Sequence, residues 1–153
     1  MIKIIHSFSG IDFEGLATVY DLNDKDGYTD YWEFFDYLRD VFFTAPGAFY
    51  AVREDEKGYA SVLRAEPYSD GYLIEALQTR SDIRNKGFAK ELLGSVVRGA
   101  VIPEGLPIYS HIRKNNTESL AVHRSCGFKE YLEYAKYIDG SVYTNSCTMI
   151  YRR

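Results

Sequence analysis

The sequence predicts an α/β (α+β) domain in which a mixed sheet carries helices on its faces. Three observations support this class. Apolar segments of strand length fill the middle of the chain and are separated by turn residues. Segments with apolar residues at a period of about 3.6 lie before and after them. With 153 residues, the chain has the size of one domain, which we expect to cover residues 1–153.

The N-terminal part predicts one strand, over residues 2–7, followed by two helices. Asp12–Tyr20 and Asp30–Phe43 each place apolar side chains on one helix face. Turn residues over 23–27 predict the loop between them. Ala45-Pro-Gly47 ends the second helix.

The middle part predicts three strands, over residues 48–53, 58–65 and 71–79. Short turns over 54–58 and 66–71 join them, so two antiparallel hairpins are expected. The remaining elements are a helix from Gly87 to Ala100, a strand from Pro107 to Ile112, a helix from Thr117 to Ser125, and strands over Lys129–Ile138 and Tyr143–Tyr151. The order is therefore β-α-α-β-β-β-α-β-α-β-β.

Composition narrows the classes of partner and compartment. The net charge is −4, so nucleic acid is not the expected partner. No apolar run approaches the roughly 20 residues that span a bilayer, and the N-terminus reads as a strand rather than a signal peptide. Cys126 and Cys147 have no metal-binding spacing, so we predict no metal site and a reducing cytoplasm.

The segment Thr79–Leu93 joins a predicted strand to a predicted helix. Its loop carries Arg84, Lys86 and Gly87. Cations at a helix start oppose the helix dipole, and glycine allows a ligand to approach the backbone. The loop therefore predicts a pyrophosphate site, although it matches neither the P-loop nor the Rossmann pattern. The alternative is an ordinary strand exit and a solvated helix start.

A second polar segment begins at Asn116, which is expected to cap the following helix. Ser119 and His123 lie four residues apart and share a helix face. Gly127 ends the helix, and Phe128 follows it.

With both segments in the same order and at an ordinary separation, the chain resembles the GNAT superfamily of acetyl-CoA-dependent N-acetyltransferases over nearly its whole length. The family pattern [RQ]-x-x-G-x-[GA] matches residues 84–89. The family pattern N-x-x-[SA]-x-x-x-Y-x-x-x-G-F matches residues 116–128, with His123 in the tyrosine position.

The resemblance implies a mixed, mostly antiparallel sheet of six to seven strands, splayed at its centre and flanked by about four helices. It implies acetyl-CoA as cofactor, with the diphosphate held by the backbone of the first motif. It also implies that the pantetheine arm lies along the strand end before that motif. The implied cofactor-binding residues are Leu77, Gln78, Thr79, Arg84, Asn85, Lys86, Gly87, Phe88, Ala89, Asn116 and Ser119.

Three positions depart from the family pattern. Asn85 stands where glycine is common, and Ser81 where proline is common. His123 stands where the family often has a tyrosine that protonates the departing thiolate, and an imidazolium can do the same work. The alternative is that His123 is a packing residue and the acid comes from elsewhere, for example from Tyr109, Tyr131 or Tyr134.

Glu75 is the candidate base that removes a proton from the incoming ammonium. Strand alternation places Glu75, Leu77 and Thr79 on one face. A carboxylate within an apolar strand is costly, which favours a function for it, and the resemblance to the acid-bearing strand of bacterial GNAT enzymes agrees. The alternative is a strand-edge glutamate that faces solvent or pairs with Arg80.

The acceptor site is expected near the first two helices. Nine acids and two bases lie between Asp12 and Asp40, a net charge of −7, which attracts cations. Tyr28, Tyr31 and Trp32 are candidates for cation–π contacts with a small cationic amine. The alternative is that these are ordinary amphipathic surface helices.

The sequence as a whole therefore predicts an N-acetyltransferase that moves an acetyl group from acetyl-CoA to a primary amine by direct attack in a ternary complex. The alternative function is a catalytically weak GNAT-like module that binds coenzyme A as a sensor or partner subunit. A homodimer through the last strands is also expected, and no membrane partner.

Overall fold

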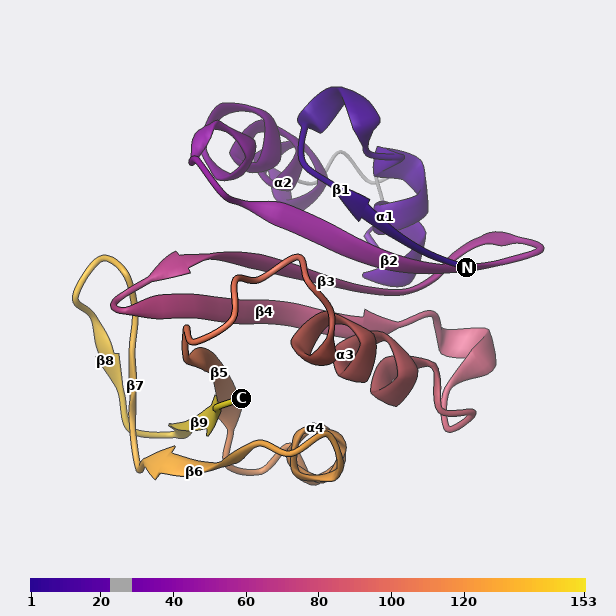
Figure 1. Cartoon of the computed structure of the whole chain (residues 1–153). Coiled ribbons are helices and arrows are strands. Elements are labelled where there is room, and N and C mark those ends of the chain that lie inside the picture. The colour runs from indigo at the N-terminus through magenta and orange to yellow at the C-terminus, as the bar shows by residue number, and fades with distance from the viewer. Residues whose placement is uncertain (23–28) are drawn as a thin grey trace.

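Seven strands form the main sheet in the computed structural model of the protein, which describes residues 1–22 and 29–153. Their spatial order is β1, β2, β3, β4, β5, β9, β6 (Figure 1). Their bounds are β1 Ile2–Ile5, β2 Phe49–Asp55, β3 Gly58–Tyr68, β4 Gly71–Thr79, β5 Ile108–Arg113, β6 Lys129–Leu132 and β9 Ser146–Tyr151. A separate hairpin is formed by β7 (Ala135–Lys136) and β8 (Val142–Tyr143).

The pairing confirms the predicted mixed, mostly antiparallel sheet. Strands β4 and β5 are parallel, and every other neighbouring pair among the described residues is antiparallel. The two expected hairpins, β2–β3 and β3–β4, are both present. A parallel pair needs a crossover connection, and here α3 provides it.

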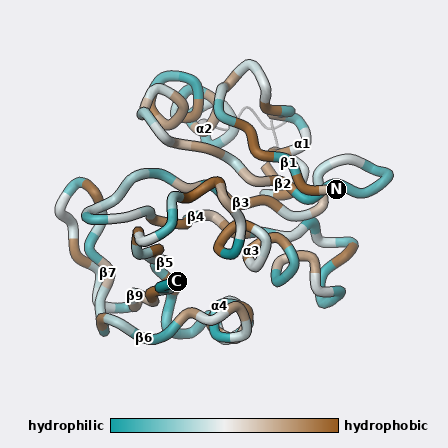
Figure 2. Tube along the Cα trace, in the orientation of Figure 1, coloured by the Kyte–Doolittle hydropathy of each residue, from teal (hydrophilic) through white to brown (hydrophobic). Residues whose placement is uncertain are grey.

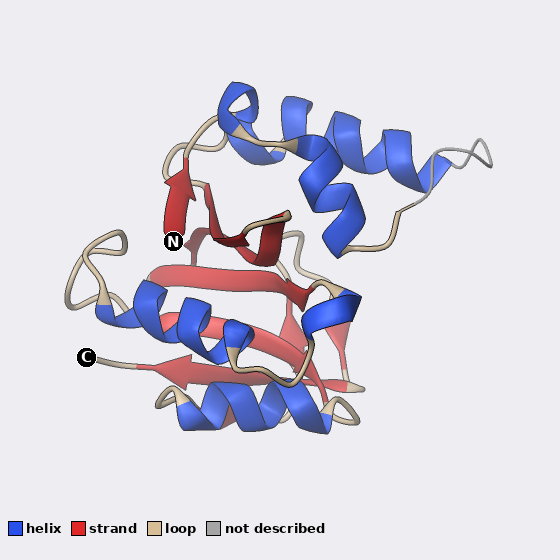
Figure 3. Cartoon of the chain, turned by 90° about the vertical axis from the view of Figure 1, so that its right-hand side faces the viewer, coloured by secondary structure: helices blue, strands red, loops and turns tan. Residues whose placement is uncertain are grey.

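Helices cover both faces of the sheet (Figures 1 and 3). The α1/α2 face carries α1 (Phe13–Val19) and α2 (Thr29–Asp40), whose apolar side chains pack with β2 and β3 in one core. The α3/α4 face carries α3 (Phe88–Arg98) and α4 (Thr117–Ser125), which pack in a larger second core. Hydrophobic residues recur along the strands and the inner side of α3, whereas the β2–β3 turn is hydrophilic (Figure 2).

Several elements differ in their bounds from the sequence prediction, and three of the differences have a visible local cause or divide an element. Helix α2 stops at Asp40 because Val41 has φ −124° and ψ −65°, outside the helical range. The predicted strand 129–138 is interrupted after β6, where Thr148 donates its hydroxyl to the Tyr134 carbonyl at 2.7 Å. The predicted strand 143–151 divides into β8 and β9 at a turn.

Over residues 1–22 and 29–153, no helix is long and apolar enough to cross a lipid bilayer.

Candidate functional site

Strands β4 and β5 separate halfway along their length. Their ladder pairs Tyr72–Ile74 with residues 108–110 and goes no further. Strand β4 continues to Thr79 and β5 to Arg113. The edge of β4 that faces β5 is therefore unpaired from Glu75 onward, which confirms the splay implied by the resemblance.

A β-bulge in β4 lies at the same level. Between the pairs Arg64–Glu75 and Val62–Gln78, the ladder advances one residue more on β4 than on β3. Ala76 sits in this bulge with φ 54°, a left-handed conformation that is uncommon for a residue with a Cβ. Bulges redirect side chains and are frequent next to active sites.

The bulge corrects one expectation from the sequence. Glu75 pairs with Arg64 at 3.5 Å on the α1/α2 face, where the guanidinium lies over the ring of Phe42. Leu77 packs instead against the core on the α3/α4 face. The prediction that Glu75, Leu77 and Thr79 share one face was wrong, because the extra residue reverses the alternation after Glu75.

A chain of hydrogen bonds holds the bulge in place. The Tyr20 hydroxyl, at the end of α1, donates to the Ala76 carbonyl at 2.8 Å. The same hydroxyl lies 3.1 Å from the Tyr50 hydroxyl, which accepts from Arg64 at 3.4 Å. Helix α1 is thereby tied to the strained residue of β4.

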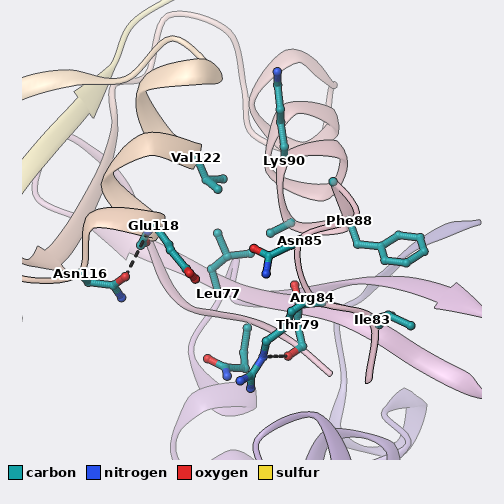
Figure 4. Close-up of a pocket in the computed structure, with 14 residues that line it drawn as sticks. Leu77, Thr79, Ile83, Arg84, Asn85, Phe88, Lys90, Asn116, Glu118 and Val122 are labelled. Atoms are coloured by element: carbon teal, nitrogen blue, oxygen red, sulfur yellow. Dashed lines mark hydrogen bonds between the residues drawn. The ribbon is translucent and has the colours of Figure 1, made fainter. Parts of the chain in front are cut away.

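A pocket of about 340 Å³ opens on the other face, between the free edge of β4 and the first turns of α3 and α4 (Figure 4). All but one of the predicted cofactor-binding residues line it, the exception being Lys86. The lining consists of Leu77, Gln78, Thr79, Ile83, Arg84, Asn85, Gly87, Phe88, Ala89, Lys90, Asn116, Glu118, Ser119 and Val122.

The start of α3 presents backbone donors to this pocket. Gly87 precedes the helix with φ 85° and has no side-chain cap. The first amides of an α-helix have no intrahelical partner, and the first helical bond here comes from Glu91 to the Gly87 carbonyl. A Cβ at Gly87 would have no atom within 4 Å, so the space in front of these amides is open. Such a cradle fits a diphosphate.

The charged side chains around the pocket carry both signs. Arg84 donates through Nε to the Thr79 carbonyl at 3.1 Å, which holds its guanidinium beside the end of β4 (Figure 4). Lys90 lines the pocket, as does the acid Glu118. Sequence reasoning named Lys86 as the second cation, whereas the structure places Lys90, one helical turn further on, at the pocket wall.

Helix α4 begins as predicted, with the Asn116 side chain accepting from the Ser119 amide at 3.1 Å. His123 is only 2% exposed and does not line the pocket. Its Nδ1 lies 2.7 Å from the Ser119 carbonyl and must donate to it, so Nε2 accepts from the Ser110 hydroxyl at 2.9 Å. Burial lowers the pKa of His123, which favours the neutral ring.

The three alternative acids lie elsewhere. Tyr109 donates its hydroxyl to Asp70 at 2.6 Å. Tyr131 and Tyr134 are 48% and 40% exposed. None of the three lines the pocket.

Glu75 belongs to a partly buried charge cluster on the α1/α2 face. Its partner is Arg64, not the predicted Arg80, which is bound instead by Asp55 and Asp82. Glu66 is the second acid of the cluster, and the two carboxyls affect each other's pKa. Burial, together with the charge of Glu75, raises the pKa of Glu66 to about 7, and burial raises the pKa of Glu75. Near neutral pH the two carboxyls therefore share a proton.

Sequence reasoning missed Arg64 and His111, which both lie near Glu75 in the sheet. Each is an ionisable residue inside an apolar strand, within Val62–Ala65 or Ile108–Ile112. An ionisable side chain within an apolar strand is the pattern that identified Glu75, and it could have identified Arg64 and His111 as well.

The predicted acceptor residues are spread over different environments. Tyr28 lies outside the described residues. Tyr31 is 5% exposed, packs edge-on against Phe13, and donates its hydroxyl to Glu14. Trp32 is 53% exposed and is open to a ligand.

Part of the predicted acidic rim is already paired. Asp12 caps α1 by accepting from the Gly15 amide. Asp36 and Asp40 both bind Arg39. These three carboxylates are therefore less available to a cationic ligand than the sequence indicated.

Comparisons with known proteins agree with this geometry. The family model described as "FR47-like protein" matches residues 51–137. No curated protein matches the chain.

Solved structures match over the full chain at low sequence identity. The crystal structure of ribosomal-protein-alanine N-acetyltransferase from Brucella melitensis has a TM-score of 0.70 at 18% identity, covering 100% of this chain and 99% of that one. A GNAT-family acetyltransferase from Bacillus cereus ATCC 10987 has a TM-score of 0.65 at 15% identity, covering 100% and 98%. An N-acetyltransferase from Staphylococcus aureus Mu50 has a TM-score of 0.69 at 15% identity, covering 97% and 100%.

At these sequence identities the similarity to solved structures shows the fold alone. The family model covers more than half of the chain. The chain belongs to the FR47-like family, and its fold is that of the GNAT acetyltransferases.

Proposed function

We propose that the protein is an N-acetyltransferase that moves an acetyl group from acetyl-CoA to a primary amine by direct attack in a ternary complex. The observation that carries the proposal is the position of the open, uncapped start of α3 beside the free edge of β4. A partly buried carboxyl cluster lies on the opposite face at the same level. A ligand in the pocket and a base are thus brought together where β4 and β5 separate.

The described residues fit coenzyme A. Phe88, Ala89 and Lys90 would offer backbone amides to its diphosphate, with Arg84 and Lys90 as nearby cations. The unpaired edge at Leu77–Thr79 would bind the pantetheine arm in the manner of an added strand. Bound acetyl-CoA supplies the activated acetyl group.

Glu75 is the proposed proton acceptor for the acceptor's ammonium group. An alkylamine attacks only as the neutral amine, and its pKa is near 10.4 in water. Burial raises the pKa of Glu75, which makes its carboxylate a better base than an exposed glutamate. The guanidinium of Arg64 lies 3.5 Å from the Glu75 carboxyl group. It favours the charged carboxylate and holds this group in place.

His123 is the residue that the family motif nominates as acid. Both of its ring nitrogens are bound within the protein, and its route to the pocket runs through Ser119, whose hydroxyl lies 3.4 Å from Nδ1. This geometry favours a positioning role for His123, in which it fixes Ser119 and the start of α4.

A cationic amine remains the proposed acceptor class, supported by the net negative charge of residues 12–40 and by exposed Trp32. The acceptor panel consists of spermidine, lysine amide, an aminoglycoside and a peptide with N-terminal alanine. The peptide is included because two similar structures bear the names of ribosomal-protein-alanine N-acetyltransferases. Each amine is paired with a neutral analogue, and equal, weak responses to all would remove the cationic preference.

The second candidate is a module that binds coenzyme A without catalysis. The specific observation in its favour is the fully bonded His123, since no acid reaches the pocket directly from that position. Turnover separates the two candidates, because both predict binding. A homodimer also stays a prediction: Tyr143 is 50% exposed, and the mass of the protein in solution decides it.

The decisive experiment is thermal unfolding with and without acetyl-CoA. At about 100 times its dissociation constant, the ligand should stabilise the wild type by about 2.7 kcal/mol. Gly87→Glu should abolish this gain, because its side chain enters the open cradle. Gly105→Glu is the matched control, since Gly105 has φ 87° and open space like Gly87 but lies outside the pocket. No gain in the wild type would refute the proposed cofactor site.

A further inference from the structure

His111 occupies the place directly across from Glu75 where the two strands part. The last parallel pairs are Leu73–Tyr109 and Ile74–Ser110. Continuing this register by one step gives Glu75 and His111, the first residues of β4 and β5 that no longer pair. The two therefore stand at one level, on either side of the opening.

Both side chains also lie on the α1/α2 face. Leu73 and Tyr109 pack together in one cluster on that face. Side chains two residues further along a strand return to the same side, which places Glu75 and His111 beside this cluster. The charge of Glu75, after burial, contributes to the raised pKa of Tyr137, whose ring lies 4.7 Å from that of His111.

Neither ring nitrogen of His111 has a hydrogen-bond partner among the described residues, although both are buried. The ring is held edge-on by Tyr68 at 5.6 Å and by Tyr137, so its place is fixed by packing. Buried polar atoms without a partner are rare in folded proteins and call for an explanation. His123, on the opposite side of β5, has both of its nitrogens bonded.

The charges around His111 limit which kind of ligand group could hydrogen-bond to its ring nitrogens. Burial lowers the pKa of His111 to about 4, so the ring is neutral and offers one acceptor nitrogen. The Glu66–Glu75 carboxyls disfavour an anion at this place, and Arg64 is already bound to Glu75. A neutral or positively charged hydrogen-bond donor fits the acceptor nitrogen, and the amine of the proposed function is such a donor.

Tyr137, which packs on His111, also borders a pocket. This second pocket, of about 380 Å³, is lined by Tyr137 and Arg113 together with residues of the β7–β8 hairpin and the start of β9. Tyr137 borders this pocket, and its ring lies 4.7 Å from that of His111, so a ligand in the pocket lies one side chain away from His111.

We propose that His111 is a catalytic residue that accepts a hydrogen bond from the acceptor's amino group and holds it opposite Glu75. The inference rests on the proposed function and adds the second contact of the amine. The ammonium donates one proton to the Glu75 carboxylate, which becomes the neutral acid. One of the two remaining N–H bonds points to His111, and the lone pair is left free for attack.

The test combines kinetics with a binding signal that does not depend on turnover. His111→Phe keeps the ring contacts with Tyr68 and Tyr137 but removes the acceptor nitrogen. We expect kcat/KM for the best amine of the panel to fall by about 10- to 100-fold. His111→Gln restores an acceptor oxygen and should recover part of the loss. His6→Phe, at an exposed position, is the matched control.

The second readout is the imidazole nitrogen spectrum of the wild type saturated with coenzyme A. Three histidines are present, so the His111 signals are assigned by their loss in His111→Gln. Adding the amine should shift the His111 signals and leave those of His6 and His123 in place. This readout decides the question if His111→Phe does not fold.

The outcomes separate the two proposals. Unchanged kcat/KM in a folded His111→Phe, or an unshifted His111 signal while the amine turns over, would overturn the role of His111 and leave the acetyltransferase intact. If the wild type shows neither stabilisation by acetyl-CoA nor turnover of any amine, the proposed function fails, and the role of His111 fails with it.

Discussion

Each side of β5 carries a histidine whose ring nitrogens are buried, and the two differ in their hydrogen bonds. On the α3/α4 side, His123 has both nitrogens bonded, to Ser110 and to the Ser119 carbonyl. On the α1/α2 side, His111 has neither nitrogen bonded and faces the level of Glu75. A family motif draws attention to the first histidine, whereas unsatisfied hydrogen bonds draw attention to the second. The position that the family motif indicates and the position with unsatisfied nitrogens therefore lie on opposite faces of one strand.

The largest expected effect concerns the α1/α2 side. Glu75→Gln keeps the shape of the side chain but removes its ability to take a proton. We expect kcat to fall at least about 100-fold, the usual contribution of a general base. The affinity for acetyl-CoA should stay within about two-fold, because the cofactor pocket lies on the other face. Steady-state kinetics and calorimetric binding measure the two quantities.

Glu104→Gln, at an exposed glutamate, controls for the loss of a carboxylate as such. Equal losses of kcat and cofactor affinity in Glu75→Gln would contradict the proposal that cofactor binding and proton removal lie on opposite faces of the sheet. Such a result would mean that Glu75 supports the pocket rather than the chemistry.

A smaller effect on activity is expected on the α3/α4 side. His123→Phe keeps the edge-on contact with Phe128, 5.0 Å between ring centroids, but leaves the Ser110 hydroxyl without its acceptor. We expect the free energy of unfolding to fall by about 1–3 kcal/mol. In this variant kcat should fall less than about 10-fold, below the contribution typical of a general acid. Chemical denaturation and saturating kinetics measure the two effects.

The motif prediction gives the opposite pattern for the same variant. If His123 is the acid, kcat in His123→Phe falls about 100-fold or more and the basic limb of the pH–rate profile disappears. The comparison of His123→Phe with His111→Phe therefore shows directly which side of β5 carries the chemistry.

Much of the fold and of the cofactor pocket was predictable because the signals are local. Asn116 caps α4 and Gly87 precedes α3 as their residue types indicate, and the splay followed from the resemblance. The acceptor side was not predictable in the same way. Arg64 and His111 come together with Glu75 only through the pairing of three strands. The bulge at Ala76 depends on a hydrogen bond from distant Tyr20, so simple alternation misplaced Leu77 and Thr79.

The smallest expected effect is the pH dependence of the carboxyl pair. The pKa of Glu66 is raised in the folded protein to about 7, mainly by burial and then by the charge of Glu75. The folded state therefore holds a proton that the unfolded chain has released, from about pH 4.3 upward, and stability is lost as the pH rises toward about 7. Glu66→Gln should remove this loss. Because Glu66 is half-buried and screened by water, the gain near pH 8 should be about 1 kcal/mol or less.

His111 changes the free energy of unfolding in the opposite direction in part of the same pH range. The pKa of His111 is lowered to about 4, so its contribution to stability is complete above about pH 6.5 and is lost as the pH falls toward about 4. The other groups facing the carboxyl pair are Arg64 and the tyrosines Tyr20, Tyr37, Tyr50 and Tyr137. These do not titrate in this range, since the pKa of each tyrosine is raised. With Glu66→Gln, the free energy of unfolding should therefore rise more steeply with pH than in the wild type.

The pH dependence of kcat/KM is a second, independent test of the interaction between Glu66 and Glu75. The interaction with Glu66 lowers the pKa of Glu75, so without the Glu66 carboxyl Glu75 should lose its proton at higher pH, and the acidic limb of kcat/KM should move upward by up to about one pH unit. Denaturation and rate profiles from about pH 5 to pH 8, with Glu104→Gln alongside, measure both effects. An acidic limb that stays in place in Glu66→Gln would show that the two carboxyls do not share a proton. The base on the α1/α2 face would then be Glu75 acting alone beside Arg64.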